Sequence, residues 1–350
     1  MSIGDILFND YNLLANISSN IIKEKKINYT NSTGITELKK TILSIYDYQQ
    51  NYNENNVIIC NGAKHCLFNC LFSILEENDE VIIPIPYWPS YVDLTLLMKS
   101  KPIFVKNNSF IVKAEEIEKK ITKKTKALII NNPNNPSGMI VDEKELEKII
   151  DLAIKYNFYL ICDEVYMDIY FSKRTKSILE LKKSMLIKDK LIIINSVSKR
   201  FGLSGLRLGY MILPSSLVEV VKALQSNMTS NPNTIAQYTV DIILKEHQNI
   251  NTILRKRLKS RKDYIIEKLK KLSSIRIKNY SEFGIYLLIE TKEDSKIIFD
   301  KLLKEEGVAV MPGEVFGLEK YIRVSFSGKD EEFIEGVDRI VKFFNKKIDK

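Results

Sequence analysis

The sequence predicts an α/β fold, with a mostly parallel β-sheet covered by helices on both faces and a smaller α+β domain. Between residues 57 and 195, short apolar segments alternate with segments of helical periodicity. This alternation is typical of parallel strands joined by helices, because both faces of such a sheet are buried. From about Asn233 the strand-like segments stop, and they return only near the C-terminus. A chain of 350 residues is long enough for two domains.

The expected elements follow from the spacing of apolar residues. Short apolar runs predict strands at 57–60, 81–85, 103–105, 127–130, 158–162 and 191–195. Helical spacing predicts helices at 11–24, 36–48, 62–76, 92–99, 114–121 and 142–155. The rest of the chain predicts a long helix over 233–272, broken near 248–251, then strands at 284–290, 308–311 and 321–326 and helices at 294–305 and 330–345. We therefore expect a large domain of residues 30–245 and a small domain of residues 1–29 and 246–350.

The composition is ordinary for a globular protein, with 45% apolar and 28% charged residues. No apolar run approaches the roughly 20 residues that span a bilayer, and the first residues lack the features of a signal peptide. The cysteines lie in or beside apolar segments and lack the spacing of a zinc site: Cys60, Cys66, Cys70 and Cys162. We therefore expect buried thiols, no metal, no membrane partner and a cytoplasmic location.

The net charge of +9 raises the question of nucleic-acid binding. The basic residues, however, are scattered over 113–126, 182–190, 255–271 and 346–350, where they are mixed with Glu and Asp. Mixed charges of this kind are typical of solvated helix faces, so we expect no nucleic-acid partner.

The most informative stretch runs from Ser196 to Tyr210, directly after an apolar strand. Lys199 lies just past the strand end among small residues, and Arg207 follows eight residues later. Burial and a nearby cation both lower the pKa of a lysine towards the neutral amine, which forms Schiff bases with carbonyl compounds such as pyridoxal phosphate. The guanidinium of Arg207 suits a phosphate. The alternative is a solvated loop of basic residues.

The spacing of this stretch resembles the lysine signature of class I/II pyridoxal-phosphate-dependent aminotransferases, which have the aspartate aminotransferase fold (fold type I). Ser196-Val-Ser198-Lys199 is followed, after five residues, by Gly205-Leu-Arg207-Leu-Gly209. The resemblance extends from Gly4 to Arg323. It implies that Lys199 holds the cofactor as an aldimine, and it places Ser196, Ser198 and Arg207 among the cofactor-binding residues.

Two further segments follow predicted strands and have a place in the resemblance. Gly62-Ala63-Lys64 opens a helix, where free N–H groups and the helix dipole attract an anion, and it resembles the family's phosphate turn. A glycine before a helix is common, so this signal is weak alone. Trp88 is the only tryptophan. The resemblance implies that it stacks on the cofactor's pyridine ring, whereas ordinary packing is the alternative.

The predicted loop Asn131–Gly138 contains two prolines and resembles the family's Asn-Pro-Thr/Ser-Gly box. The resemblance assigns Asn135 to the cofactor's phenolic oxygen and to the substrate. By itself the loop could be only a turn before the helix that follows.

Asp163 lies at a predicted strand end, and Tyr166 follows three residues later. A carboxylate opposite the pyridine nitrogen keeps the ring protonated, so that the ring withdraws electrons from the substrate. The resemblance gives Asp163 this role and gives Tyr166 the phenolic oxygen. A strand-end Asp can instead cap a helix.

Arg323 is the one arginine in a predicted apolar strand of the small domain. An anion should meet it, because a buried arginine without a partner is costly. The resemblance implies that the anion is the substrate α-carboxylate and that Gly4 also contacts the substrate. A structural Asp or Glu is the alternative. The sequence identifies no particular second cation for a side-chain carboxylate, since many lysines could serve.

Tyr29 precedes the predicted large domain by one residue. The resemblance implies that this tyrosine crosses a two-fold interface to the cofactor phosphate of the neighbouring subunit, so we expect a homodimer. Tyr29 could instead pack under its own helix. The segment beginning at Ser2 lacks both the family's proline and the arm of some tens of residues that usually precedes it.

Together these features predict a pyridoxal-phosphate-dependent aminotransferase that moves an amino group between an amino acid and a 2-oxo acid. Two alternatives remain open. The first is another pyridoxal-phosphate reaction on the same scaffold, such as β-elimination, cyclisation or oxidation, because the cofactor residues are shared. The second is a binding protein without a cofactor. The sequence does not identify the amino acid.

Overall fold

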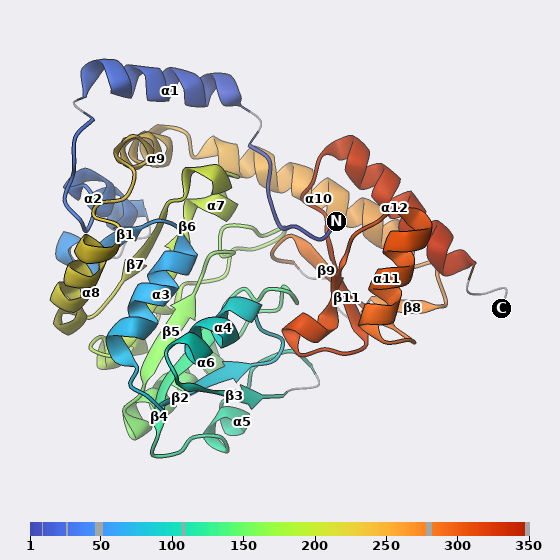
Figure 1. Ribbon diagram of the computed structural model, residues 1–350, viewed down its shortest axis with the longest axis horizontal. Helices are drawn as coiled ribbons and strands as arrows, with labels where there is room; N and C mark the ends of the chain where they lie inside the picture. The colour runs from blue at the N-terminus through green and yellow to red at the C-terminus, as the bar shows by residue number, and fades with distance from the viewer. Residues whose placement is uncertain (9, 26, 46–51, 107–108, 278–281, 347–350) are drawn as a thin grey trace.

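The computed structural model describes all residues of the chain except 9, 26, 46–51, 107–108, 278–281 and 347–350. It contains a seven-stranded sheet and a four-stranded sheet, each with its own helices (Figure 1). The predicted helix at 36–48 forms over Thr36–Ile45, and its last predicted residues lie outside the described ones. No described helix is both long and apolar enough to cross a membrane.

The larger sheet is mostly parallel, which confirms the predicted fold class. Its strands are β1 (Val57–Cys60), β2 (Glu80–Pro84), β3 (Lys101–Val105), β4 (Thr125–Asn131), β5 (Tyr159–Asp163), β6 (Leu191–Ser196) and β7 (Gly209–Ile212). They lie in the order β1-β7-β6-β5-β4-β2-β3. Only β7 runs antiparallel to its neighbours, β1 and β6. The connection from β6 to β7, residues 197–208, contains only short helical turns, whereas the crossover between parallel strands usually includes a full helix.

The helices cover both faces of this sheet. One face packs against α1 (Tyr11–Glu24), α2 (Thr36–Ile45), α5 (Ala114–Glu118), α6 (Glu143–Tyr156) and α9 (Thr234–Glu246). The other face packs against α3 (Ala63–Ile74), α4 (Pro89–Leu97) and α8 (Ser215–Met228). Successive residues of a strand point to opposite faces, so Ile59 enters the first core and Ile58 the second. Both faces are therefore apolar, as the unbroken apolar runs predict.

The smaller sheet is antiparallel and has the order β10-β11-β9-β8. Its strands are β8 (Ile275–Ile277), β9 (Tyr286–Thr291), β10 (Met311–Pro312) and β11 (Tyr321–Ser325). Its helices are α10 (Asn249–Leu269), α11 (Ser295–Glu306) and α12 (Asp330–Asn345). The three-residue strand β8 was not predicted, because a run of this length carries no periodicity. The predicted long helix is two helices, α9 and α10, and the break falls near the predicted position.

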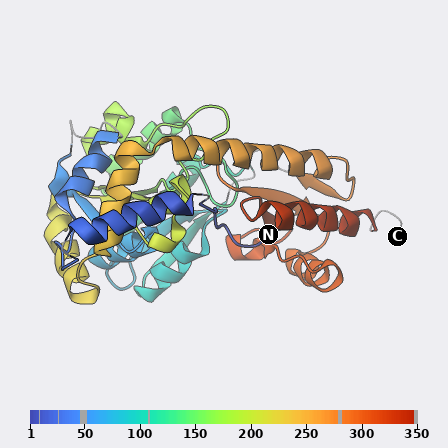
Figure 2. The ribbon, with the colours of Figure 1, turned by 90° about the horizontal axis from the view of Figure 1, so that it is seen from above.

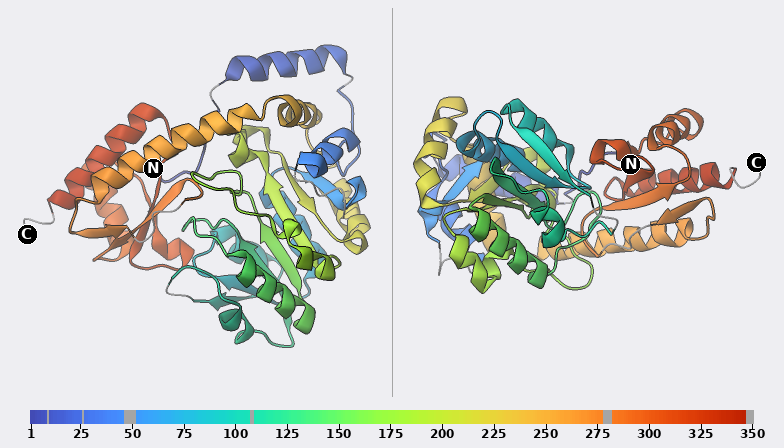
Figure 3. Two further views of the ribbon diagram at one scale, coloured as in Figure 1. Left: turned by 180° about the vertical axis from the view of Figure 1, so that it is seen from behind. Right: turned by 90° about the horizontal axis from the view of Figure 1, so that it is seen from below.

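The two sheets are joined by α10, which extends from the helices of the larger sheet along the smaller one (Figure 2). Seen from behind and from below, the smaller sheet and its helices lie to one side of the larger sheet (Figure 3). The helix α1 packs on α9, and its residues Ile17 and Ile21 enter the core of the larger sheet. The predicted domain boundaries, 30–245 for the large domain and 1–29 with 246–350 for the small one, remain a prediction.

Candidate active site

A cavity of about 320 Å³ lies where the two sheets meet. Three neighbouring strands of the larger sheet contribute their last residues to its wall, namely Asn131 of β4, Asp163 of β5 and Ser196 of β6. The smaller sheet contributes Tyr286 and Arg323. Ligands of open parallel sheets bind at the carboxyl ends of the strands, so the cavity is in the position expected for a binding site.

The structure brings nearly all of the predicted site residues to this cavity. The lining includes Gly4, Ala63, Lys64, Trp88, Asn135, Asp163, Tyr166, Ser196, Ser198, Lys199, Arg207 and Arg323. Gly62 lies just behind the wall, and Tyr29 lies elsewhere on the surface. The residues of the lining that the sequence did not single out are Tyr91, Asn131, Val165, Ser204 and Tyr286.

Lys199 belongs to α7 (Val197–Arg200), a single turn that follows β6. The hydroxyl of Ser196 begins this turn by accepting a hydrogen bond from the backbone N–H of Ser198 at 3.1 Å. The Nζ atom of Lys199 donates to the backbone carbonyl of Gly4. Burial, with Arg323 and Arg207 nearby, lowers the pKa of Lys199 to about 8 despite the opposing charge of Asp5. A minor but significant fraction of this amine is therefore neutral near physiological pH, far more than in an exposed lysine.

Asp163 is a buried carboxylate at the end of β5. Its Oδ2 accepts a hydrogen bond from the hydroxyl of Tyr91 at 2.7 Å, and its Oδ1 accepts one from the N–H of Val165 at 3.2 Å. No described Lys or Arg forms an ion pair with it, and burial raises its pKa to about 6. A turn follows Asp163 rather than a helix, so the residue is not a helix cap.

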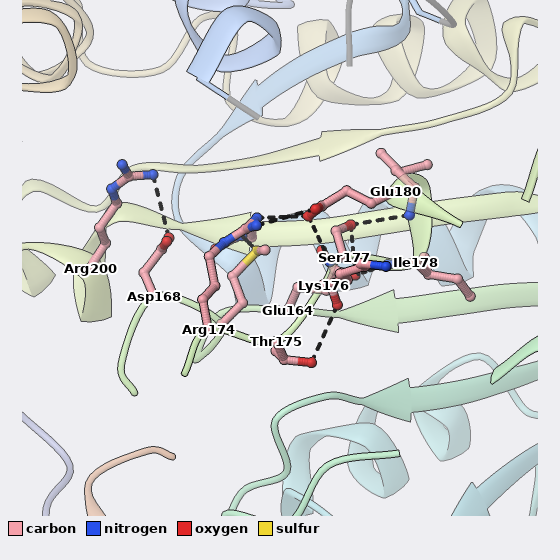
Figure 4. A network of polar contacts seen from close by, with 12 residues as sticks. Glu164, Asp168, Arg174, Thr175, Lys176, Ser177, Ile178, Glu180 and Arg200 are labelled. Carbon is pink, nitrogen blue, oxygen red and sulfur yellow. Dashed lines mark hydrogen bonds and ion pairs between the residues drawn. The ribbon is translucent and has the colours of Figure 1, made fainter. Parts of the chain in front are cut away.

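The segment that follows Asp163 is fixed by polar contacts of residues outside the cavity lining (Figure 4). The Oε1 of Glu164 accepts hydrogen bonds from the hydroxyl of Ser177 and the N–H of Ile178, both at 2.9 Å. Arg200, next to Lys199, forms a buried ion pair with Asp168 at 3.4 Å. These contacts tie the turn of Lys199 to the loop after β5, so the two segments keep their relative positions.

Arg323 projects from β11 between two aromatic rings, with its Cζ atom 4.0 Å from the centre of Tyr286 and 4.8 Å from that of Phe316. Its guanidinium donates to the side-chain oxygen of Asn135 at 3.1 Å and to the carbonyl of Ser2 at 2.6 Å. In the described part of the chain, no Asp or Glu pairs with it and its Nε has no hydrogen-bond partner. The alternative, in which a structural Asp or Glu pairs with Arg323, is therefore wrong for the described residues.

The turn before α3 lies beside Arg207. Gly62 has a φ of 88°, and a Cβ atom on it would lie 2.7 Å from the Nη2 of Arg207, so only glycine lets the guanidinium come this close. The first N–H groups of α3 and this guanidinium therefore lie at one corner of the cavity. Both attract anions.

Lys64 and Trp88 lie together on the cavity wall. The Nζ of Lys64 is 5.1 Å from the ring centre of Trp88, which contacts Tyr91 edge to face at 5.5 Å. Among the described residues, no carboxylate lies within 4.0 Å of this ammonium group. Lys64 lies at the start of α3, and Trp88 and Tyr91 lie at the start of α4. Tyr91 follows Trp88 by three residues, a helical spacing by which the sequence could have indicated that the two rings meet.

Tyr29 lies outside the cavity and is 90% exposed. Side chains of α9 contact the residues on both sides of it. The hydroxyl of Thr234 donates to the backbone carbonyl of Asn28 at 2.9 Å, and Gln237 donates to the side-chain hydroxyl of Thr30 at 3.1 Å. The alternative in which Tyr29 packs under its own helix is therefore wrong.

Comparison with known proteins identifies the family. The sequence matches the family described as aminotransferase class I and II over residues 2–340. The aspartate aminotransferase of Bacillus subtilis is 33% identical, over 98% of this chain and 90% of that protein. The chain belongs to the class I and II aminotransferases.

Solved structures of other aminotransferases have the same fold. The aspartate aminotransferase of Thermotoga maritima has a TM-score of 0.91 and 32% identity, over 98% of this chain and 91% of that chain. The aromatic aminotransferase of Pyrococcus horikoshii has a TM-score of 0.92 and 27% identity, over 99% of this chain and 95% of that chain. The family, the fold, the aminotransferase activity and the dependence on pyridoxal phosphate predicted from the sequence are thereby confirmed.

The cavity of this aminotransferase fits pyridoxal phosphate on its own chemistry. The corner between Gly62 and Arg207 suits a phosphate, and the buried carboxylate of Asp163, whose pKa is raised by burial, suits a protonated ring nitrogen. The volume is within the range of about 300–1,000 Å³ that is usual for small-molecule sites. Among the described residues, no group of three or more His, Cys, Asp or Glu could hold a metal ion.

Proposed function

We propose that this aminotransferase takes the amino group from an acidic amino acid such as aspartate and passes it to a 2-oxo acid, with Lys199 as the catalytic lysine. The observation that carries the proposal is the pair of cations, Arg323 and Lys64, that line the same cavity as the low-pKa Lys199. Two of the related proteins named above are aspartate aminotransferases, and the third is an aromatic aminotransferase.

The cofactor would be held by residues on the larger sheet. Its phosphate would lie at the turn of Gly62 and Ala63 with Arg207, and Ser196 and Ser198 would complete this corner. Trp88 would cover the ring, and Asn135 and Tyr166 would reach its phenolic oxygen. When bound, pyridoxal phosphate supplies an aldehyde that bonds covalently to amines and a ring that withdraws electrons from the carbon bearing the amino group.

Lys199 would act as the base and acid of the reaction. Its amine is neutral in part near neutral pH, because burial lowers its pKa to about 8. A neutral Nζ would take the proton from the substrate α-carbon and deliver it to the cofactor carbon that had carried the aldehyde. The carbonyl of Gly4, which accepts from Nζ, holds the amine towards the cavity.

Asp163 would keep the cofactor's ring nitrogen protonated. Its carboxylate is buried, and the hydrogen bond from Tyr91 fixes its orientation. Burial destabilises the charge of this carboxylate. A cationic ring nitrogen would therefore be attracted to it more strongly than to a solvent-exposed carboxylate.

The substrate would lie between two cations. Arg323 would bind the α-carboxylate, since its guanidinium presents two donors in one plane and has no described acidic partner. Gly4 and Asn135 would contact the same end of the substrate. Lys64, which the resemblance assigns to the cofactor's phosphate turn, would instead use its ammonium group to bind the side-chain carboxylate, which accounts for an acidic substrate.

The functional unit would be a homodimer in the cytoplasm, with two domains in each chain. The described part of the chain leaves the side chain of Tyr29 90% exposed, and a neighbouring subunit's cofactor phosphate would give its hydroxyl a partner. The four cysteines are buried and free, which suits a reducing compartment. Residues 30–245 would form the large domain, and residues 1–29 and 246–350 the small one.

The activity is tested by mixing the yellow holoenzyme with single amino acids and following the loss of its absorbance, with and without a 2-oxo acid. An aminotransferase bleaches once with the amino acid alone and recovers when the 2-oxo acid is added. We expect aspartate and glutamate to bleach it at the lowest concentrations. Continuous consumption of an amino acid without a 2-oxo acid would instead indicate an elimination or oxidation.

A further inference from the structure

Tyr286 lines the cavity and contacts several of its residues, although it belongs to none of the sequence motifs. It lies in β9 and is 5% exposed. Its hydroxyl is 3.2 Å from the hydroxyl of Tyr166, and its ring lies 4.0 Å from the Cζ atom of Arg323. One side chain of the smaller sheet therefore contacts both the tyrosine after β5 and the arginine of β11.

The N-terminal segment also meets this residue. A Cβ atom on Gly4 would lie 1.6 Å from the Oη of Tyr286, so the backbone of Gly4 rests directly against the hydroxyl. The carbonyl of Gly4 accepts from Lys199, which brings the hydroxyl pair close to the amine of the cavity.

We propose that Tyr286 is a positioning residue with two separable roles: its hydroxyl directs the O–H of Tyr166 into the cavity, and its ring supports the guanidinium of Arg323. The inference rests on the proposed function, which puts the cofactor's phenolic oxygen at Tyr166. It goes beyond that function by adding a residue that acts through two others.

The first role follows from counting protons. Each phenol has one proton to donate, so the Tyr166 proton can point into the cavity only if Tyr286 is the donor between the two. Burial raises the pKa of Tyr166 well above its usual value, so Tyr166 keeps its proton. The other groups that face it are Arg323, Asp163 and Tyr91, and the hydroxyl of Tyr91 is already committed to Asp163.

The second role follows from the position of the guanidinium over the ring. An aromatic face attracts a cation, and this attraction strengthens when both groups are shielded from water. Arg323 is 7% exposed, and its Nε has no hydrogen-bond partner in the described part of the chain. The ring therefore replaces part of the hydration that the guanidinium has lost, and it fixes the plane in which its donors lie.

The two roles are separated by two substitutions in the holoenzyme. Tyr286→Phe removes the hydroxyl and keeps the ring, and Tyr286→Leu removes both. The first measurement is the pH midpoint of the bound cofactor's absorbance without substrate, and the second is the KM for the amino acid. Tyr156→Phe serves as the matched control, because Tyr156 lies on the surface and bonds to Glu118.

A donor favours the anionic form of the oxygen it faces, so weakening the Tyr166 donor should move the absorbance midpoint to higher pH. We expect an upward shift of about half to one pH unit in both Tyr286 variants and none in the control. The KM should change little in Tyr286→Phe and rise about two- to thirtyfold in Tyr286→Leu. A normal midpoint in Tyr286→Phe would overturn the first role, and an unchanged KM in Tyr286→Leu would overturn the second.

Tyr166→Phe shows whether Tyr286 acts through Tyr166. We expect it to shift the midpoint at least as far, and we expect Tyr286→Phe to add nothing in that background. An additive shift would overturn the inference and leave the proposed function intact. If Tyr166→Phe itself left the midpoint unchanged, the placement of the cofactor at Tyr166 and the hydroxyl role would both be wrong.

Discussion

The two sides of the cavity are built in different ways. On one side, Asn131, Asp163 and Ser196 end adjacent strands of the larger sheet, whose backbone hydrogen bonds fix their spacing. On the other side, Arg323 is held to the N-terminal segment by a single hydrogen bond to the carbonyl of Ser2. A carboxylate is a stronger acceptor than a neutral carbonyl, so an incoming substrate can take over this donor. The rigid side suits a resident cofactor, and the replaceable contacts suit a substrate that comes and goes.

This difference makes a general prediction about kinetics. Substitutions of the residues at or just after the strand ends of the larger sheet, such as Asp163 and Lys199, should lower kcat, because these groups act on the bound cofactor. Substitutions on the opposite side should mainly raise KM, because they remove contacts that the substrate makes before and during the reaction.

The largest effect is expected for Lys199→Ala. Turnover should fall by at least about a thousandfold, because the variant loses both the covalent anchor and the proton carrier. Pyridoxal phosphate should still bind, since the phosphate corner is unchanged. Borohydride reduction of the wild-type holoenzyme and peptide mapping should find the cofactor on Lys199, with Lys182→Ala as a surface control. Label on another lysine would contradict the assignment.

Asp163→Asn should lower kcat about a hundredfold or more while cofactor affinity falls much less. A neutral amide cannot hold the ring nitrogen protonated, but it keeps the shape that accepts the hydrogen bond from Tyr91. Stopped-flow measurement of α-proton abstraction, with a deuterated substrate, separates this step from binding. A rate equal to that of the wild type would show that Asp163 does not face the ring.

On the opposite side, Arg323→Leu should raise the KM for every amino acid by about ten- to a hundredfold, because hydrogen bonds to a charged group are worth about 1.5–3 kcal/mol. The kcat at saturation should fall less than in Asp163→Asn. A KM that rises for some amino acids and not for others would place Arg323 at the side-chain end of the substrate.

Lys64→Met tests that other end. The KM for aspartate and glutamate should rise about tenfold, and the KM for alanine should stay within a factor of about two, since one charged contact is lost. Met keeps an unbranched apolar side chain of similar length beside Trp88 and removes the ammonium group that faces the ring. Lys106→Met is the matched control on the surface. An equal loss for acidic and neutral substrates would indicate that Lys64 serves the cofactor instead.

The same difference explains what the sequence could predict. The residues of the larger sheet belong to short motifs after apolar strands, so a strand end and a few neighbours were enough to locate Asp163 and Lys199. Tyr286 is one aromatic residue in an apolar strand, where nothing distinguishes a residue facing the cavity from one in the core. Its position depends on how β9 pairs with β11, which brings Tyr286 opposite Ser325. Pairing over long sequence distances is not encoded in local periodicity.

The direction of β7 shows the same limit. The sequence motif locates Gly205 to Gly209, but the alternation of side chains is the same for a parallel and an antiparallel strand. The connection after β6 has no full helix to carry the chain back for a parallel strand, and it sets Arg207 in a left-handed conformation, with φ of 51°, beside Gly62. The sequence therefore identifies the motif, but it does not predict the direction of the strand or the position of Arg207.

The smallest single-variant effect is expected for Tyr29→Ala, which should weaken cofactor binding about five- to tenfold through the loss of one hydrogen bond. Complementation with Arg207→Ala tests whether Tyr29 serves the neighbouring subunit. In a mixed dimer, the chain with Tyr29→Ala keeps its own Arg207 and receives an intact Tyr29 from its partner, so one of the two sites is whole. Co-expressed and separately tagged chains should therefore regain up to about half of the wild-type cofactor binding. If mixed dimers form without any recovery, Tyr29 serves its own chain, and its exposed position has another cause.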